Sequence, residues 1–178
     1  MKKVIIIHGW SGFPEEGRFP WIKERLEEND FVVQVPKMPN PDHPVIKSWV
    51  SHLKSIAGKP DENTYFIGHS IGCQTILRYL EALPENYKIG GVILVAPWLI
   101  LTDNETKEEK EIGKSWIETQ INFEKIKKHT NNFISIFSDD DAIVPIENKK
   151  LFEKKLNTKT FILRNTSAAC CGDKTISL

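Results

Sequence analysis

Cysteine is scarce in this sequence, and the few cysteines form no recognisable metal or disulfide pattern. The 178 residues contain three, an odd count, and the last two, Cys170 and Cys171, are adjacent. No Cys-x-x-Cys pair with histidines at zinc-binding spacing is present. We therefore expect reduced thiols and no bound metal.

The chain also lacks an excess of charge and a long apolar run. Lysine plus arginine number 24, as do aspartate plus glutamate, so the formal net charge is zero. A neutral chain gives no electrostatic reason to expect nucleic acid or an acidic membrane surface as a partner. No apolar run approaches the roughly 18 residues of a spanning helix, and the apolar stretch after Met1 is too short for a signal peptide. We expect no nucleic-acid partner, no membrane association and a cytoplasmic location.

Internal repeats, low-complexity stretches and linkers are absent as well. A chain of 178 residues, 40% of them hydrophobic, matches one ordinary domain of about 100–200 residues. A domain near this size buries about 70% of the surface of its unfolded chain and needs no structural metal to fold. Residues 1–178 are therefore expected to form a single domain.

What the sequence does contain is an alternation of short β-branched runs with segments of helical periodicity. This alternation predicts an α/β fold, a doubly wound and mostly parallel sheet with helices on both faces. The near-continuous apolar runs at residues 4–7 and 92–96 fit strands that are covered on both faces. About six strands are expected, at residues 4–7, 31–35, 64–67, 91–96, 133–137 and 160–163.

The segments between the strands carry apolar stripes that we expect to face the sheet. The first stripe consists of Trp21, Ile22 and Leu26. Residues 97–130 are charge-dense and long for a crossover, so we expect one or two helices there, lying over the carboxyl ends of the strands. The inward stripe of that segment is predicted to be Ile112, Trp116 and Ile117.

A Gly-x-Ser-x-Gly pentapeptide, residues 68–72, follows the third predicted strand and precedes a predicted helix. This context is typical of a nucleophile elbow, a sharp turn that strains the serine backbone and exposes its hydroxyl. Gly68 and Gly72 are expected where a β-carbon would collide with a neighbouring strand or helix. The alternative is a chance pentapeptide in a loop, but the strand before it and the helix after it favour Ser70 as a nucleophile.

The sequence His8-Gly9-Trp10-Ser11-Gly12 ends the first predicted strand. A serine nucleophile needs backbone N–H groups to stabilise the oxyanion, one from the residue after the serine and one from a facing loop. Ile71 and Trp10 are the candidates for these two donors. Taken alone, the glycines of this loop indicate only a turn at the end of a strand.

Three consecutive aspartates, Asp139, Asp140 and Asp141, follow the fifth predicted strand. An acid at this place suits the chain order Ser, Asp, His of a catalytic triad. We select Asp141 because the Asp-x-x-Val-Pro arrangement places it at the turn before the next helix. A turn or helix-cap role remains open for each aspartate.

Four motifs together resemble the small serine hydrolases of the retinoblastoma-binding-protein-nine type, a single-domain branch of the α/β-hydrolases. The resemblance extends from residue 1 to about residue 165. It implies a compact α/β-hydrolase fold, a triad carried here by Ser70 and Asp141, no metal, no cofactor, and small esters or amides as substrates. The motifs are His8-Gly9-Trp10, Met38-Pro39-Asn40-Pro41 with Trp49 beyond it, Gly68-His69-Ser70-Ile71-Gly72, and Asp141-Ala142-Ile143-Val144-Pro145.

The sequence departs from the family pattern where the triad histidine belongs. The family places a Gly-His pair after the last strand, and those positions hold Ser167 and Ala168 here. No histidine follows His129. Of the earlier histidines, His8 and His69 lie in the two motifs, and we interpret both as structural. The general base is therefore unassigned.

The segment from residue 165 to 178 has no apolar stripe, although this fold normally closes with an amphipathic helix. A frameshifted or truncated end would explain both the missing helix and the missing histidine. Such an atypical end is expected to leave part of one sheet face uncovered and to promote self-association. Two function classes follow, a serine hydrolase acting on small esters or amides, and a catalytically inactive binding module on the same fold.

Overall fold

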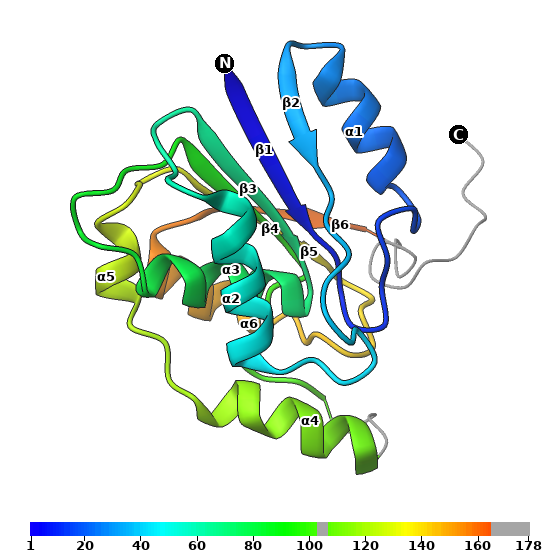
Figure 1. Ribbon diagram of the computed structural model, residues 1–178. Coiled ribbons are helices and arrows are strands. Elements are labelled where there is room, and N and C mark those ends of the chain that lie inside the picture. Colours follow the sequence, from blue (N-terminus) through cyan, green and yellow to red (C-terminus); the bar gives the residue numbers. More distant parts are fainter. Residues whose placement is uncertain (103–106, 165–178) are drawn as a thin grey trace.

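The computed structural model describes residues 1–102 and 107–164, which contain six parallel strands in one sheet. The strand order is β2-β1-β3-β4-β5-β6, so the chain winds outward in both directions from β1 and β3 (Figure 1). The predicted doubly wound α/β fold is confirmed. The strands are β1 (Lys2–Ile7), β2 (Phe31–Gln34), β3 (Thr64–His69), β4 (Gly91–Val95), β5 (Phe133–Ser138) and β6 (Lys159–Leu163).

The main core lies on the sheet face that receives Ile5 and Ile7 of β1. Phe66 of β3 and Leu94 of β4 point to the same face, and all four side chains are fully buried. The period of two along each strand explains why alternate residues share this face. The helices that complete this core are α2 (Ile46–Ala57), α3 (Ile71–Glu81), α5 (Phe123–Lys127) and α6 (Asn148–Leu156).

The opposite face is covered by α1 (Phe19–Glu27), which packs Ile22 and Leu26 against Val4 and Ile6. The expectation that Trp21 joins this stripe is wrong, because its side chain is 58% exposed. Ile22 and Leu26 are four residues apart and lie on the buried face of this short helix. The Trp21 side chain is rotated about 100° from that of Ile22 around the helix axis. Its ring lies instead beside the Arg25 guanidinium, at 5.9 Å.

The outer edge of the sheet is less well covered. Phe161 and Ile162 of β6 are 43% and 44% exposed. Among the described helices, α1 is the one that packs on the second face, and it contacts the opposite end of the sheet, near β2. The predicted defect after residue 165 lies outside the described residues.

Two helices occupy the long segment between β4 and β5, as predicted. The first, α4 (Lys107–Glu118), lies beyond the carboxyl ends of the strands (Figure 1). Trp116 anchors it, because its indole Nε1 donates to Pro44 O at 3.0 Å and its ring meets Trp49 edge to face. Ile117 was expected to face inward and does not, since 43% of it is exposed. Within the described residues, no helix is long and apolar enough to cross a membrane.

Candidate active site

Ser70 lies between the end of β3 at His69 and the start of α3 at Ile71. Its φ of 51° and ψ of −118° form a conformation that a non-glycine residue rarely adopts. The turn is held on both sides, because Ser70 N–H donates to Val95 O at 2.9 Å and Cys73 N–H donates to Ser70 O at 3.0 Å. The backbone therefore has the sharp strand-to-helix turn that the sequence predicts.

The two flanking glycines allow this turn to pack closely. A β-carbon on Gly68 would lie 2.7 Å from Cys73 N, and one on Gly72 would lie 2.7 Å from His8 O and closer still to Ile7 O. Backbone atoms cannot move away as the end of a flexible side chain can. The predicted mechanical role of both glycines is confirmed.

The site lies at the switch point of the sheet. The strand β2 lies on one side of β1, and β3 lies on the other side. The loops that follow β1 and β3 therefore leave neighbouring carboxyl ends in opposite directions along the sheet. Doubly wound sheets bind ligands in such a crevice. Here the crevice brings the Gly9–Gly12 loop beside the elbow, and a β-carbon on Gly9 would lie 3.7 Å from Ser70 Cβ.

A cavity of about 410 Å³ opens over Ser70. It brings together three of the residues singled out from the sequence, namely Ser70, Trp10 and Asp141, whereas Asp139 and Asp140 do not line it. Ile71, the second candidate oxyanion donor, lies directly behind Ser70 and is fully buried. The lining residues are Gly9, Trp10, Ser11, Glu16, His69, Ser70, Ala96, Trp98, Leu101, Glu109, Asp141, Ile143 and Val144.

The N–H groups of Trp10 and Ile71 are available for an acceptor. Among the turn and loop backbone hydrogen bonds of the described residues, neither group is a donor. Two hydrogen bonds to the segment after β2 hold the loop that carries Trp10. The Trp10 indole Nε1 donates to Asp42 O at 2.9 Å, and Ser11 N–H donates to Pro41 O at 2.9 Å. The N–H of Ile71 is at the positive end of the α3 dipole. This geometry suits an oxyanion hole.

The two carboxylate oxygens of Asp141 differ in their hydrogen bonding. Its Oδ1 accepts hydrogen bonds from Ile143 N–H and Val144 N–H, each at 2.9 Å, so the turn role left open by the sequence is real. Its Oδ2 is buried and has no hydrogen-bond partner among the described residues. Asp140 is exposed and bound by the Ser138 hydroxyl. Of the three aspartates, Asp141 alone lines the cavity.

The Ser70 hydroxyl has a partner that sequence reasoning missed. Trp98 Nε1 donates to Ser70 Oγ at 3.3 Å, and the Trp98 side chain is 2% exposed. Trp98 lies two residues beyond Ala96, which directly follows β4 and has a positive φ of 48°. The available signal was a tryptophan a few residues after a strand, because a buried indole N–H needs an acceptor.

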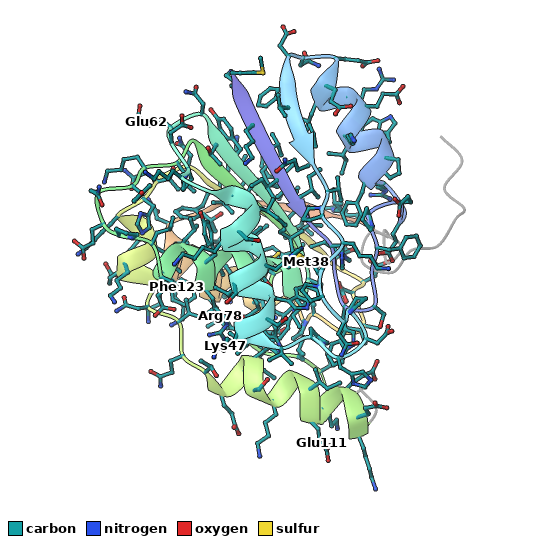
Figure 2. The ribbon with its side chains drawn as sticks, viewed as in Figure 1. Met38, Lys47, Glu62, Arg78, Glu111 and Phe123 are labelled. Atoms are coloured by element: carbon teal, nitrogen blue, oxygen red, sulfur yellow. The ribbon has the colours of Figure 1, made fainter. Side chains whose placement is uncertain are left out.

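His8 is a structural residue, as interpreted from the sequence. It is fully buried, its Nδ1 donates to Gly9 O at 2.8 Å, and its Nε2 accepts from Met38 N–H at 3.0 Å. Met38 lies in the interior, on the connection that follows β2 (Figure 2). Burial lowers the pKa of His8, with an opposing effect from its bond to Gly9 and a smaller one from Glu16. A neutral ring with both nitrogens engaged cannot accept a proton from Ser70.

All five histidines are within the described residues, and His69 alone among them lines the Ser70 cavity. Its ring lies against Gly9 and makes an edge contact with Phe19. None of the described histidines hydrogen-bonds to Ser70 Oγ, whose partner is Trp98. Ala168, where the family resemblance places the histidine, is outside the described residues.

No cluster of three or more possible metal ligands occurs in the described part of the chain. Cys73 is fully buried beneath the elbow and donates to Val95 O, and burial raises the pKa of its thiol far above the usual range. It is a free thiol, not a competing nucleophile. Cys170 and Cys171 lie outside the described residues.

The sheet, the elbow and the cavity at the switch point define an α/β-hydrolase. Residues 4–168 match the family described as Serine hydrolase, and the chain belongs to that family. It is 31% identical over 160 residues to "Putative hydrolase YdeN" of Bacillus subtilis, covering 90% of this chain and 82% of YdeN. It is 25% identical over 158 residues to Serine hydrolase RBBP9 of Rattus norvegicus, covering 88% of this chain and 76% of that protein.

Solved structures agree with the fold. The crystal structure of the B. subtilis ydeN gene product superposes with a TM-score of 0.85 at 28% identity, covering 95% of this chain and 88% of that one. Est1E of Butyrivibrio proteoclasticus, solved with ferulic acid bound, superposes with a TM-score of 0.73 at 16% identity, covering 96% and 82%. The second likeness concerns the fold alone.

Proposed function

We propose that the chain is built to hydrolyse small carboxylic esters or amides, with Ser70 as the nucleophile. One observation carries this proposal: Ser70 has a strained positive φ at a strand-to-helix turn, and it lines a cavity that Asp141 lines as well. Strained backbone persists where the surrounding structure enforces it, and such positions cluster at functional sites.

In the proposed reaction, Ser70 Oγ attacks the carbonyl carbon while its proton passes to a general base. The carbonyl oxygen becomes an oxyanion and accepts the N–H groups of Trp10 and Ile71. Collapse of this intermediate expels the alcohol or amine, which takes the proton from the base. Water then attacks the acyl-serine ester, releasing the carboxylic acid and restoring Ser70. These steps use neither a metal ion nor an organic cofactor.

Trp98 prepares Ser70 for this reaction. Because Ser70 Oγ accepts the indole N–H, the hydrogen of the hydroxyl itself is left to point at a base. The same hydrogen bond holds the hydroxyl in one orientation. Trp98 is therefore a positioning residue, since it acts through Ser70.

Asp141 is the proposed acid that orients the base. Its Oδ1 is fixed by two backbone N–H groups, which leaves Oδ2 to receive an imidazole N–H. A buried carboxylate oxygen without a donor is costly, so a donor is expected in the complete site. The family position for that donor is residue 168, which holds alanine.

The alternative function, a non-catalytic binding module, is favoured by one observation. Ser70 Oγ has no histidine partner among the described residues, although the cavity is formed. On this account the cavity binds a small ester or amide without turning it over. If the protein is a hydrolase, the site lacks only a general base. If it is a binding module, supplying a base would not make the site catalytic.

Repair of residues 167 and 168 distinguishes them. The repaired chain carries Ser167→Gly and Ala168→His, followed by an amphipathic closing helix, and is assayed with p-nitrophenyl acetate. If the site lacks only its base, the repaired chain hydrolyses the ester and the same chain with Ser70→Ala does not. A folded repaired chain without Ser70-dependent hydrolysis would support the binding module.

A further inference from the structure

The segment that follows β4 carries the indole that binds the Ser70 hydroxyl. Trp98 Nε1 donates to Ser70 Oγ, so the position of this donor depends on the backbone that carries Trp98. Residues 97–102 belong to no helix or strand, and the hydrogen bonds of the sheet therefore do not hold them. Buried backbone groups outside regular structure need other partners.

Two buried amide side chains bind the peptide group between Trp98 and Leu99, one at each polar end. Gln74 Nε2 donates to Trp98 O at 2.7 Å, and Leu99 N–H donates to Asn148 Oδ1 at 2.7 Å. Gln74 is 1% exposed and Asn148 is fully buried. Because a peptide group is planar, bonds to its C=O and its N–H together fix its rotation. The backbone at Trp98 is therefore held from both sides.

Asn148, the first residue of α6, also connects this segment to the one that carries Asp141. Its Nδ2 donates to Ile100 O at 2.9 Å and to Pro145 O at 3.0 Å. Pro145 directly follows Val144, whose N–H donates to Asp141 Oδ1. One amide thus joins the segments that follow β4 and β5.

Gln74 lies on α3, four residues after Ser70. Its Oε1 accepts a hydrogen bond from Arg78 Nη2 at 3.3 Å, which directs its Nε2 toward Trp98 O. The contacts form a closed circuit, because α3 joins Ser70 to Gln74, Gln74 binds the Trp98 backbone, and the Trp98 indole binds Ser70. The orientation of the Ser70 hydroxyl thus depends on a side chain of its own helix.

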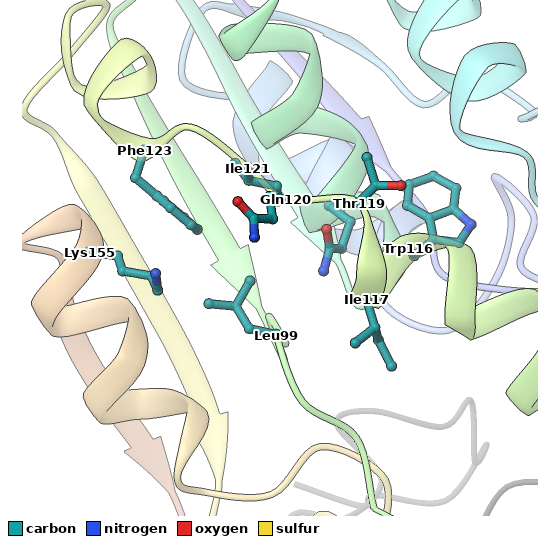
Figure 3. A pocket seen from close by; sticks show the side chains of 9 residues that line it. Leu99, Trp116, Ile117, Thr119, Gln120, Ile121, Phe123 and Lys155 are labelled. Atoms are coloured by element: carbon teal, nitrogen blue, oxygen red, sulfur yellow. The ribbon is translucent and has the colours of Figure 1, made fainter.

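Neither amide belongs to the residues that line the Ser70 cavity in the described part of the chain. Gln74 lines a separate cavity together with Leu99, which lies on the segment that leaves β4 (Figure 3). Trp98 itself lines the Ser70 cavity. An influence of Gln74 on a substrate at Ser70 would therefore pass through Trp98.

We propose that Gln74 is a positioning residue for Ser70, acting by holding the Trp98 peptide group against Asn148. The inference rests on the proposed function, since positioning matters only if Ser70 reacts. Without the Gln74 donor, the peptide group is free to rotate and the indole N–H moves away from Ser70 Oγ. A purely structural amide would stabilise the fold and leave the reactivity of Ser70 in the folded chain unchanged.

Two substitutions of Gln74 test this role in the intact chain. Gln74→Glu removes the donor to Trp98 O and keeps an oxygen for Arg78, which forms no salt bridge within the described residues. The new ion pair should keep this variant folded, and Gln74→Met removes the same donor without adding a charge. We expect a fluorophosphonate to label Ser70 about two- to threefold more slowly in both, the effect of one weakened hydrogen bond.

A matched control and a double substitution separate positioning from stability. Ser135→Ala removes a fully buried hydroxyl that bonds to Thr158 at 3.0 Å, and it should leave the labelling rate unchanged. In the Trp98→Phe background, which has no indole N–H, the Gln74 substitutions should cause no further slowing. A loss of general stability would instead slow labelling in both backgrounds.

The indole resonances in a ¹⁵N spectrum give a readout that does not require Ser70 to react. The Trp98 resonance, identified by its absence from Trp98→Phe, should shift in Gln74→Met and in Ser70→Ala but not in Ser135→Ala. An unmoved resonance in Gln74→Met, unchanged labelling in both Gln74 variants, or equal slowing with and without the indole would each overturn the proposal. No labelling of the wild-type chain would contradict the proposed function, and the resonance would then decide separately whether Gln74 holds Trp98.

Discussion

The indole N–H of Trp98 donates to the hydroxyl of Ser70 across 3.3 Å, joining the segment that follows β4 to the turn after β3. The two residues are 28 positions apart, and adjacent parallel strands bring them together. Ser70 is in this way held by its backbone at the elbow and by its side chain at Trp98.

Trp98→Phe removes this donor while keeping most of the ring. A net hydrogen bond of this kind contributes about 1 kcal/mol, so we expect Ser70 to react roughly fivefold more slowly with a fluorophosphonate. Trp116→Phe is the matched control, because it removes a buried indole bond to Pro44 O instead. Equal rates in wild type and Trp98→Phe would show that the bond does not position Ser70.

We expect this chain to hydrolyse p-nitrophenyl acetate at close to the background rate. Loss of the general base lowers turnover by about 10⁶ relative to a complete triad. Clear hydrolysis that disappears in Ser70→Ala would mean that another histidine serves as the base. His69→Ala should then abolish it, because His69 is the histidine that the described structure places in the cavity.

In the repaired chain, the choice among the three aspartates can be tested directly. Asp141→Asn should lower esterase activity by about 10⁴, the loss known for the corresponding change in a serine protease triad. Asp140→Asn should have little effect, because Asp140 is exposed and outside the cavity. Equal losses in both variants would contradict the assignment of Asp141.

His8 should make the stability of the chain depend on pH. Its folded pKa is lowered from 6.5 by burial, so below that pH the unfolded chain binds more protons than the folded one. The free energy of unfolding should therefore fall as pH drops through 6.5. Urea unfolding at pH 5 and pH 7.5 measures this difference, and His8→Gln should reduce it. An unchanged difference in His8→Gln would show that other groups cause the pH dependence.

The exposed edge of the sheet leads to an expectation about solution behaviour. Phe161 and Ile162 are each more than 40% exposed on β6. Apolar surface left in water forgoes about 25 cal/mol per Å² of stabilisation, so we expect a low thermal midpoint, binding of hydrophobic dyes and self-association. Adding an amphipathic helix that covers Phe161 and Ile162 should reduce all three. A monomer that melts above the usual range of about 45–65 °C would contradict this expectation.

The fold could be predicted because its signals are local. The β-branched runs predicted all six strands, with ends that differ from the structure by at most two residues. The side chains that face the core were harder to predict. Trp21 and Ile117 are apolar and close to buried stripes, yet both are exposed, because packing against a particular neighbour fixes the rotation of each helix.

The candidate site was predictable only in part, for a related reason. The elbow at Ser70 and the turn at Asp141 are local motifs, and the structure places both at one cavity. The contact between Trp98 and Ser70 joins distant segments that carry no shared sequence pattern. Such features become visible only when strand order and helix packing are known.

The proposed role of Ser70 is tested most directly by treating the intact chain with a fluorophosphonate and measuring its intact mass. Ser11→Ala is a matched control, since Ser11 lines the same cavity, and Ser70→Ala removes the proposed nucleophile. Our account expects a single phosphonyl adduct on the wild type and on Ser11→Ala, formed slowly because no histidine of the described residues bonds to Ser70 Oγ, and none on Ser70→Ala. An adduct that persists in Ser70→Ala, or no adduct on the folded wild-type chain after prolonged treatment, would contradict it.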